Sequence, residues 1–494
     1  MSHPYPPVDL DPAGVVMRAA APVVLQSPSH LAEMNHWLFR GRADFCSPSL
    51  RILVAGGGTG EKTAQLVRQL EDIGSRGYQV VHLDLSPSSV TIARNRIALS
   101  WPDAVQTGRV IFHSGSLLDV AAMLEDAAAR PLGVGKFDYI DCLGVLHHLK
   151  QPSAGLRALQ SVLKDGGGLA FMVYGELGRI GIYHMQRMMR LFMEAEQQEQ
   201  HQGQKDRVWP GRKFINMSRR LLANLPSTNW LKMDRWRWKK LLRSVNGTGE
   251  SGIVDMFLPG HDVPMRVPEV YAMADAADME IVSFVHPALY RLETYVHDPA
   301  LLKDMQSIRS RRKREEFAEL LSGNHFHHFV YARKLFKGGG GGGGEEEEEA
   351  IRSSAASIDD PNGWDLIPVP VRFRGKDLAR VIRTKELGFL PWKTRNLQLF
   401  FRLPALAADI LEHMNGRRTV AAIFERLTPA VPREQFRAAF LHIQKTMTGM
   451  GKLFLSHYPV TYMGPSGEER ELMKALYPTS PEWGYYALPH CQHT

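Results

Sequence analysis

The sequence predicts an α/β protein with a doubly wound, mainly parallel seven-stranded sheet, a helical insertion and a smaller, mostly α C-terminal domain. Three observations indicate this fold. A glycine-rich turn joins a β-branched run to a helix-like stretch, strand-like and helix-like segments then alternate, and a last pair of apolar runs follows. Such alternation is typical of sheets covered by helices on both faces. The expected strands are 51–54, 80–84, 110–112, one within 137–149, one within 163–174, 280–285 and 328–333, with a charged helix over 301–321.

The glycine-rich turn runs from Ala55 to Glu61 and includes Gly56, Gly58 and Gly60. A turn between a strand and a helix holds a ligand's polar tail against free backbone N–H groups. Both the dinucleotide fingerprint and the phosphate loop need a glycine at position 61, where this chain has a carboxylate that would repel phosphates. The spacing instead fits a phosphate-free cofactor with a zwitterionic amino-acid tail, namely S-adenosylmethionine.

The downstream segments support that cofactor. Asp84 ends the second expected strand, at roughly the twenty-residue interval where an acid meets ribose hydroxyls. The runs FDYID…VLHHL (from 137) and LKDGGGLAFMVY (from 163) follow in order. Over residues 48–175 this set resembles the class I S-adenosylmethionine-dependent methyltransferases, which have a Rossmann-like fold. The chain departs from the family at Val54 and Ser116, where the family usually has acids.

The resemblance implies a cofactor site at the carboxyl ends of the first four strands. The glycines would hold the methionine tail, Asp84 the ribose, and Ser116 with Leu117 the adenine edge, while Gly144 would border the methyl group. The expected cofactor-binding residues are Ala55, Gly56, Gly58, Gly60, Asp84, Leu85, Ser116, Leu117 and Gly144.

Three residues after or within the fourth strand are the catalytic candidates. Methyl transfer depends mainly on alignment of the nucleophile, and a base is needed only if the acceptor arrives protonated. His147 or His148 is suited to that role, since a histidine titrates near working pH, or else both pack the following helix. Asp141 is expected to contact cofactor or substrate rather than act as a base. Tyr183 and His184 are expected to line the acceptor pocket.

Composition limits the other chemistries. The 494 residues suffice for two or three domains, and no apolar stretch approaches the roughly 20 residues that cross a bilayer, so no membrane partner is expected. Cys46, Cys142 and Cys491 are too few for a disulfide framework, which favours a reducing, cytoplasmic setting. The histidines within 325–328 have metal-like spacing without a nearby acid, so no metal is expected. The net charge of +8 makes nucleic acid a possible partner but not the favoured one.

The chain divides into four expected parts. Residues 1–47 form a helical prelude, either a lid over the cofactor or a segment packed against the sheet edge. Residues 48–337 form the methyltransferase domain, with a substrate-recognising insertion over about 176–265. The glycine and glutamate runs of 338–360 predict a flexible linker. Residues 361–494 form the C-terminal module.

Two helical segments in these flanking parts carry further predictions. Residues 29–39 predict a short amphipathic helix. Residues 410–424 predict a helix, an Asn-Gly turn and a second, capped helix, which resembles small winged-helix modules. A generic helical docking domain is the alternative.

The predicted function is methyl transfer from S-adenosylmethionine to an oxygen or nitrogen nucleophile. A separate module on a tether favours a protein or peptide acceptor over a small molecule. One alternative is a non-catalytic S-adenosylmethionine-binding or scaffold protein, motivated by Val54 and Ser116. Another is an RNA methyltransferase, for which the mixed aromatic and basic run over 230–240 is suited, although that run also fits a helix packed on a core.

Overall fold

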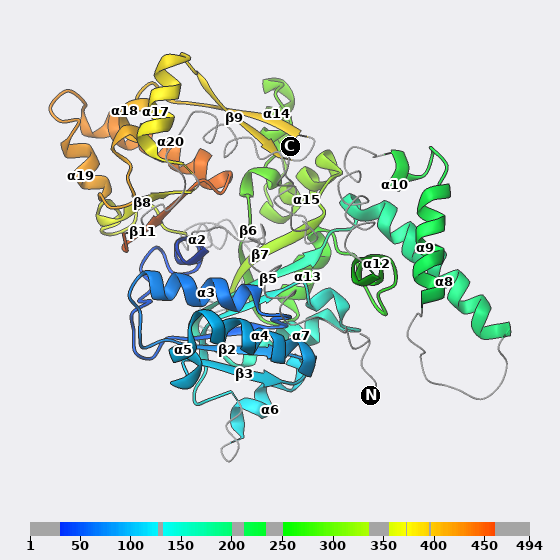
Figure 1. Cartoon of the computed structure of the whole chain (residues 1–494). Helices are drawn as coiled ribbons and strands as arrows, with labels where there is room; N and C mark the ends of the chain where they lie inside the picture. Colours follow the sequence, from blue (N-terminus) through cyan, green and yellow to red (C-terminus); the bar gives the residue numbers. More distant parts are fainter. Residues whose placement is uncertain are drawn as a thin grey trace, which may run out of the picture.

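A seven-stranded sheet in the order β3-β2-β1-β4-β5-β7-β6 forms the centre of the N-terminal part (Figure 1). The computed structural model describes residues 30–126, 132–199, 212–233, 250–334, 355–371, 373–394 and 397–459. β7 runs antiparallel to both β5 and β6, and the other neighbours are parallel. This confirms the predicted fold class. The strands are β1 (Arg51–Ala55), β2 (Gln79–Asp84), β3 (Val110–Ser114), β4 (Phe137–Leu143), β5 (Leu163–Tyr174), β6 (Met279–Phe284) and β7 (His327–Lys334).

Helices cover both faces of the sheet, which explains why its central strands are buried and carry mostly apolar side chains on both faces. On one face, α7 (Pro152–Ser161) and α13 (Val267–Asp275) pack on side chains such as Leu53 and Ile140. On the other face, α3 (Glu61–Asp72) and α4 (Pro87–Ser100) pack on side chains such as Ile52. The shorter elements beside them are α5 (Pro102–Gln106), η1 (Leu117–Asp119), α6 (Val120–Glu125) and η2 (Leu146–His148).

Two predicted elements differ in detail. The strand expected within 163–174 spans that whole run, and a bulge interrupts its pairing, because Phe137 pairs with Leu163 while Tyr139 pairs with Gly168. The single charged helix expected over 301–321 is wrong: the structure has α14 (Pro299–Met305) and α15 (Arg311–Ser322). The break is physical, since the Ser310 hydroxyl accepts a hydrogen bond from the Lys313 N–H and so starts a new helix.

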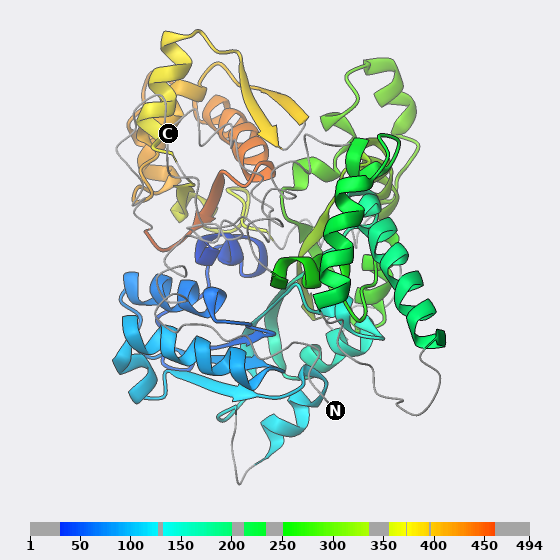
Figure 2. The ribbon, with the colours of Figure 1, turned by 45° about the vertical axis from the view of Figure 1, so that its right-hand side comes forward.

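The helix α2 (His30–Leu38) joins the sheet to the C-terminal module, as Figures 1 and 2 show. The predicted amphipathic pattern is not realised, because all nine residues of α2 are buried. Strand β11 (Leu453–Ser456) packs against α2 and covers the side that an amphipathic helix would leave exposed to solvent. The Asn35 side-chain amide donates to the Ser456 hydroxyl at 3.1 Å, and the Leu455 N–H donates to Nδ1 of His36 at 3.2 Å. The module is thus docked on the sheet through α2.

The predicted insertion is helical and projects from one side of the molecule (Figure 2). Its described helices share a core of their own, which includes Ile182, Met185, Leu231 and Phe257. They are α8 (Ile180–Glu199), which the short η3 (Leu177–Arg179) precedes, α9 (Arg212–Asn224), α10 (Trp230–Met233) and α12 (Glu250–Phe257). Most of the aromatic and basic run over 230–240 lies outside the described residues.

Between β6 and α14 lie η4 (Pro287–Tyr290) and η5 (Leu292–Thr294), and η4 contacts the C-terminal module through Ala288. The module has two two-stranded antiparallel sheets and a separate apolar core. Its elements are η6 (Gly363–Asp365), β8 (Ile367–Pro370), α17 (Gly375–Thr384), β9 (Phe389–Thr394), β10 (Leu397–Arg402), α18 (Ala407–His413), α19 (Val420–Glu425), α20 (Arg433–Gly449) and β11.

The helix, turn and capped helix predicted over 410–424 are present in the module. Asn415 Oδ1 accepts hydrogen bonds from the Arg417 and Arg418 N–H groups, and the Thr419 hydroxyl caps α19 through the Ala422 N–H. Most of the predicted linker lies outside the described residues. Of its last residues, Ala356 and Ile358 are buried in the core of the module.

Candidate active site

The glycine loop lies between the carboxyl end of β1 and the first turn of α3. Gly56, Gly58 and Gly60 have left-handed backbones, with φ of +72°, +54° and +91°. Only glycine adopts this conformation without strain. A Cβ atom at Gly56 would lie 2.3 Å from Cγ2 of Val145, which follows β4. The loop is therefore shaped by the segment that carries the predicted catalytic histidines, and Gly144 in that segment also has a positive φ, of +75°.

Asp84 ties this loop to the next one. Its Oδ2 accepts a hydrogen bond from the Gly58 N–H at 2.8 Å, and its Oδ1 accepts one from the Ser86 N–H at 2.9 Å. A carboxylate has about four lone-pair sites, so both oxygens keep acceptor capacity for a ribose. Leu85 beside it is 59% exposed, an unusual position for a large apolar side chain.

The loop after β3 contributes the predicted adenine side of the site. The Ser116 hydroxyl accepts a hydrogen bond from the Leu118 N–H at 3.2 Å and so caps η1, and Leu117 is buried. Ala55, at the end of β1, is also buried. The structure therefore brings together, at one edge of the sheet, the loops that carry the predicted cofactor residues.

His82 forms the floor of the glycine loop, and the sequence reasoning missed it. A Cβ atom at Gly57 would lie 2.4 Å from Nδ1 of His82, so only glycine fits above the ring. The Thr63 hydroxyl and that Nδ1 are hydrogen-bonded at 2.8 Å. Burial lowers the pKa of His82 to about 4, which keeps the ring uncharged.

Asp141 is buried in an ion pair beside β1. It is the Cα partner of Val54, the position where the resembling family usually has an acid. The Lys62 ammonium lies 2.8 Å from its Oδ2, and the Tyr139 hydroxyl donates to the same oxygen at 3.1 Å. His30 of α2 completes the cluster, with Nε2 at 3.4 Å from Oδ2.

The charges of this cluster are fixed by burial and pairing. Burial acts to raise the pKa of Asp141, but the charge of Lys62 and the hydrogen bond from His30 hold it below its ordinary value. Burial lowers the pKa of His30 to about 4, so this ring is neutral near pH 7. The Asp141 carboxylate is thus ionised and engaged by Lys62, while its Oδ1 has no hydrogen-bond partner.

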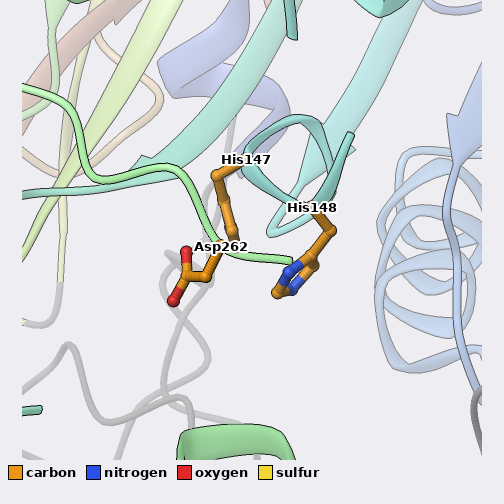
Figure 3. Close-up of side chains that lie close together, drawn as sticks. All are labelled: His147, His148 and Asp262. Atoms are coloured by element: carbon orange, nitrogen blue, oxygen red, sulfur yellow. The ribbon is translucent and has the colours of Figure 1, made fainter. Parts of the chain in front are cut away.

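The two predicted catalytic histidines lie on η2 and face a loop before α13 (Figure 3). A hydrogen bond from the Val263 N–H to the His147 carbonyl, at 2.9 Å, joins this loop to η2. The His147 ring is fully buried, and burial lowers its pKa well below the ordinary value. Nδ1 of His148 is 3.0 Å from the His261 carbonyl oxygen, so it carries the proton and donates.

Asp262 completes this group, and no sequence signal pointed to it. Its Oδ2 accepts a hydrogen bond from the Gln186 side-chain amide of α8 at 3.0 Å. One ligand atom from each of His147, His148 and Asp262 lies within 4.8 Å of the others. Among the described residues, this group and not the histidines of 325–328 meets the geometry of a metal site. His328 instead bonds through both ring nitrogens, to Tyr290 and to the Met265 carbonyl.

The two residues of α8 that were predicted to line the acceptor pocket lie in different surroundings. The Tyr183 hydroxyl donates to the Gly175 carbonyl at 3.4 Å, and burial raises its pKa. The guanidinium carbon of the buried Arg179 lies 5.8 Å from the ring centroid of Tyr183 and 3.6 Å from that of Tyr174, and the Tyr174 ring in turn lies 4.0 Å from the His147 ring. His184 is exposed. The structure therefore links Tyr183 to His147 only through Arg179 and Tyr174, and it leaves His184 in solvent.

The sheet order and glycine loop define a Rossmann-like methyltransferase fold, and the comparisons agree. Residues 53–169 match the family model described as "Methyltransferase domain". Residues 53–169 therefore belong to a methyltransferase domain of the class I, S-adenosylmethionine-dependent type, whose cofactor is S-adenosylmethionine. In the described residues no helix has both the length and the apolar character to cross a membrane.

Similar proteins differ in how much of the chain they cover. The chain is 27% identical over 303 residues to the uncharacterized protein syc1184_c of Synechococcus sp., covering 60% of this chain and 64% of that protein. It is 32% identical over 105 residues to magnesium-protoporphyrin O-methyltransferase of Rhodobacter capsulatus, covering 21% and 36%. The matches thus span less than two thirds of either relative.

The solved structure of PKMT2 from Rickettsia typhi in complex with AdoHcy is similar in fold, with a TM-score of 0.53 and 13% identity, and covers 88% of this chain and 76% of that one.

Proposed function

We propose that this protein transfers the methyl group of S-adenosylmethionine to an oxygen or nitrogen nucleophile of a protein or peptide. The observation that carries the proposal is the hydrogen bond between Asp84 and the Gly58 N–H, which joins the two loops of a phosphate-free nucleoside site. Next to that site, the buried polar group on η2 and α8 offers hydrogen-bonding side chains for an acceptor.

The residues present fit the cofactor. The left-handed glycines leave an open path along the loop, since a Cβ at Gly58 would meet no atom within 4 Å. Asp84 keeps acceptor capacity for ribose hydroxyls, and the exposed Leu85 is suited to cover an adenine or ribose face. The methyl sulfonium supplies an electrophilic carbon, so the protein needs chiefly to align the nucleophile and exclude water.

The acceptor side would be the space between η2 and the helical insertion. Tyr174, Arg179 and Tyr183 line it with aromatic surface and one buried cation. These residues would orient the acceptor, because a guanidinium stacked on a ring is held in a fixed direction. We infer that the insertion selects the acceptor and that α8 carries its main contacts.

A macromolecular acceptor is supported by the arrangement of the parts. The C-terminal module is docked through α2 and β11, so the chain presents a fixed surface beside the methyltransferase domain. The insertion adds a second projecting surface (Figure 1). The similarity in fold to PKMT2 covers 88% of this chain, so it extends beyond the methyltransferase domain into the C-terminal module. A cytoplasmic location is part of the proposal.

The test is incubation of a lysate with S-adenosylmethionine labelled in its methyl group. We expect clearly more label in the protein fraction with the natural chain than with Asp84→Ala. Label confined to RNA or to small molecules would overturn the protein acceptor. Cofactor binding without transfer to any fraction would favour a non-catalytic binding protein instead.

A further inference from the structure

We propose that His147, His148 and Asp262 form a binding site for a divalent first-row transition-metal ion such as Zn²⁺ or Mn²⁺. The three side chains come from η2 and from the loop before α13, and their carboxylate and imidazole atoms converge within 4.8 Å (Figure 3). The two segments are far apart in sequence, since His148 and His261 are separated by 113 positions. Two hydrogen bonds join the segments, one from the Val263 N–H to the His147 carbonyl and one from Nδ1 of His148 to the His261 carbonyl.

His148 is oriented as a metal-binding histidine. Its Nδ1 donates a hydrogen bond to the His261 carbonyl at 3.0 Å, so that in the neutral ring Nε2 carries the lone pair. Metal-ligating histidines almost always donate their second ring nitrogen to a carbonyl or carboxylate in this way. The geometry therefore leaves one nitrogen of His148 available as a ligand.

His147 gives the strongest independent observation. Its side chain is fully buried, yet neither ring nitrogen has a hydrogen-bond partner. Buried polar atoms are nearly always satisfied, and each exception calls for an explanation such as an ion. A metal ion between His147 and Asp262 would satisfy one of these nitrogens.

Asp262 is also held in place by a neighbouring side chain. Gln186 of α8 holds Oδ2 at 3.0 Å, while the buried Oδ1 has no hydrogen-bond partner. Oδ1 is therefore held in a fixed direction by the hydrogen bond to Oδ2, and it can bind an ion. The arrangement of a ligand held by a hydrogen-bonded neighbour is again that of a metal site.

The donor set decides which ions fit. Two imidazoles and one carboxylate suit Zn²⁺, Mn²⁺ or Fe²⁺ and leave positions open, whereas Mg²⁺ and Ca²⁺ prefer sites made of oxygen atoms. Ligand atoms around Zn²⁺ lie about 2.0–2.2 Å from the ion, so the three side chains would close slightly on binding.

The role of the ion rests on the proposed methyltransferase function. An acceptor hydroxyl bound at an open position would lose its proton to solvent more readily, because a metal ion lowers the pKa of a bound O–H group. The oxygen would then form the new O–C bond as the C–S bond of the cofactor breaks, and S-adenosylhomocysteine would leave. The site therefore favours an oxygen acceptor over nitrogen.

The test measures metal binding and cofactor binding separately on the full, untagged chain. After removal of metal with a chelator, we expect about one Zn²⁺ per chain by calorimetry and a visible absorption band with Co²⁺. Asp262→Asn and His148→Gln should each weaken Zn²⁺ binding by about a hundredfold, since loss of one ligand removes much of the affinity of a three-ligand site. His297→Gln, which changes an exposed histidine elsewhere, should leave it unchanged.

Three outcomes decide the proposal. Equal Zn²⁺ binding by the natural chain and Asp262→Asn would overturn it, as would Mg²⁺ binding as tightly as Zn²⁺. If the metal binds but its removal leaves methyl transfer unaffected, the assigned role of the ion is wrong. S-adenosylmethionine binding measured in the same samples distinguishes these results from a failure of the proposed function, because Asp262→Asn should retain it.

Discussion

The Nζ atom of Lys62 lies 2.8 Å from Oδ2 of Asp141, and both side chains are buried beside β1. Lys62 stands in the first turn of α3, where a cation opposes the helix dipole, so its place there depends on this partner. The pair links the helix that begins at the glycine loop to the strand that precedes the candidate histidines.

Removal of one member of this pair should strongly destabilise the protein. Lys62→Met leaves an uncompensated buried carboxylate, for which we expect a loss of about 3–5 kcal/mol in the free energy of unfolding. The double variant Lys62→Met/Asp141→Leu should lose markedly less, because it buries no unpaired charge. Urea denaturation of Lys62→Met, of Asp141→Leu and of the double variant measures this. Single and double variants of equal stability would contradict the ion-pair account.

A methyl group at Gly56 should damage cofactor binding through the clash with Val145. Gly56→Ala places a Cβ atom 2.3 Å from Val145 at a φ of +72°. We expect affinity for S-adenosylmethionine to fall by about tenfold or more, which corresponds to roughly 1.4 kcal/mol. Calorimetric titration measures the change.

Gly166→Ala is the matched control for backbone strain. Gly166 has a similar φ of +76°, but a Cβ there meets no atom within 4 Å. This variant should lose about 1–2 kcal/mol of stability from the left-handed backbone and bind the cofactor normally. Equal loss of cofactor affinity in both variants would show that the loop shape around Gly56 is unimportant.

Acid should weaken the contact between α2 and the C-terminal module. Burial lowers the pKa of His36 to about 3, and its Nδ1 accepts a hydrogen bond from the Leu455 N–H. In the unfolded chain this histidine has a pKa near 6.5, so below that pH it is protonated in the unfolded chain but not in the folded chain. The contribution of His36 to the free energy of unfolding is therefore fully present above about pH 6.5. It falls as the pH drops toward 3, by an amount on the order of a few kcal/mol.

His36→Asn tests this directly, because an amide oxygen can replace Nδ1 as the acceptor without titrating. The variant should lose less stability than the natural chain between pH 6.5 and 4 in urea denaturation monitored by tryptophan fluorescence. His30, whose pKa burial lowers to about 4, contributes in the same window and is present in both proteins. Identical pH slopes would refute the role of His36.

The sheet was predictable because its central strands carry mostly apolar side chains on both faces and the loops that follow them have distinct sequence signals. The pairing of β6 with β7 followed from two apolar runs of matching length. The broken helix over 301–321 was missed although Ser310, its capping residue, is visible in the sequence. The burial of α2 could not be read from its own pattern, because the strand that covers it is more than four hundred residues away, as in the bond from Asn35 to Ser456.

The candidate site, too, was predictable from the sequence only in part. The glycine loop and Asp84 are local signals, and the structure joins them by a hydrogen bond. Asp262 and the pairing of Lys62 with Asp141 depend on tertiary contacts between distant segments, so no spacing in the sequence reports them. His82 was missed because a histidine within an apolar strand has no distinctive pattern.

The central claim is that the loops after β1 and β2 hold S-adenosylmethionine through Asp84. Its most direct test is calorimetric titration of the natural chain and of Asp84→Ala with S-adenosylmethionine, S-adenosylhomocysteine, ATP and NAD⁺. We predict that the natural chain binds the first two and neither phosphate-bearing ligand, and that Asp84→Ala loses at least about tenfold in affinity, or roughly 1.4 kcal/mol. Tight binding of ATP or NAD⁺, or unchanged affinity in Asp84→Ala, would contradict the account.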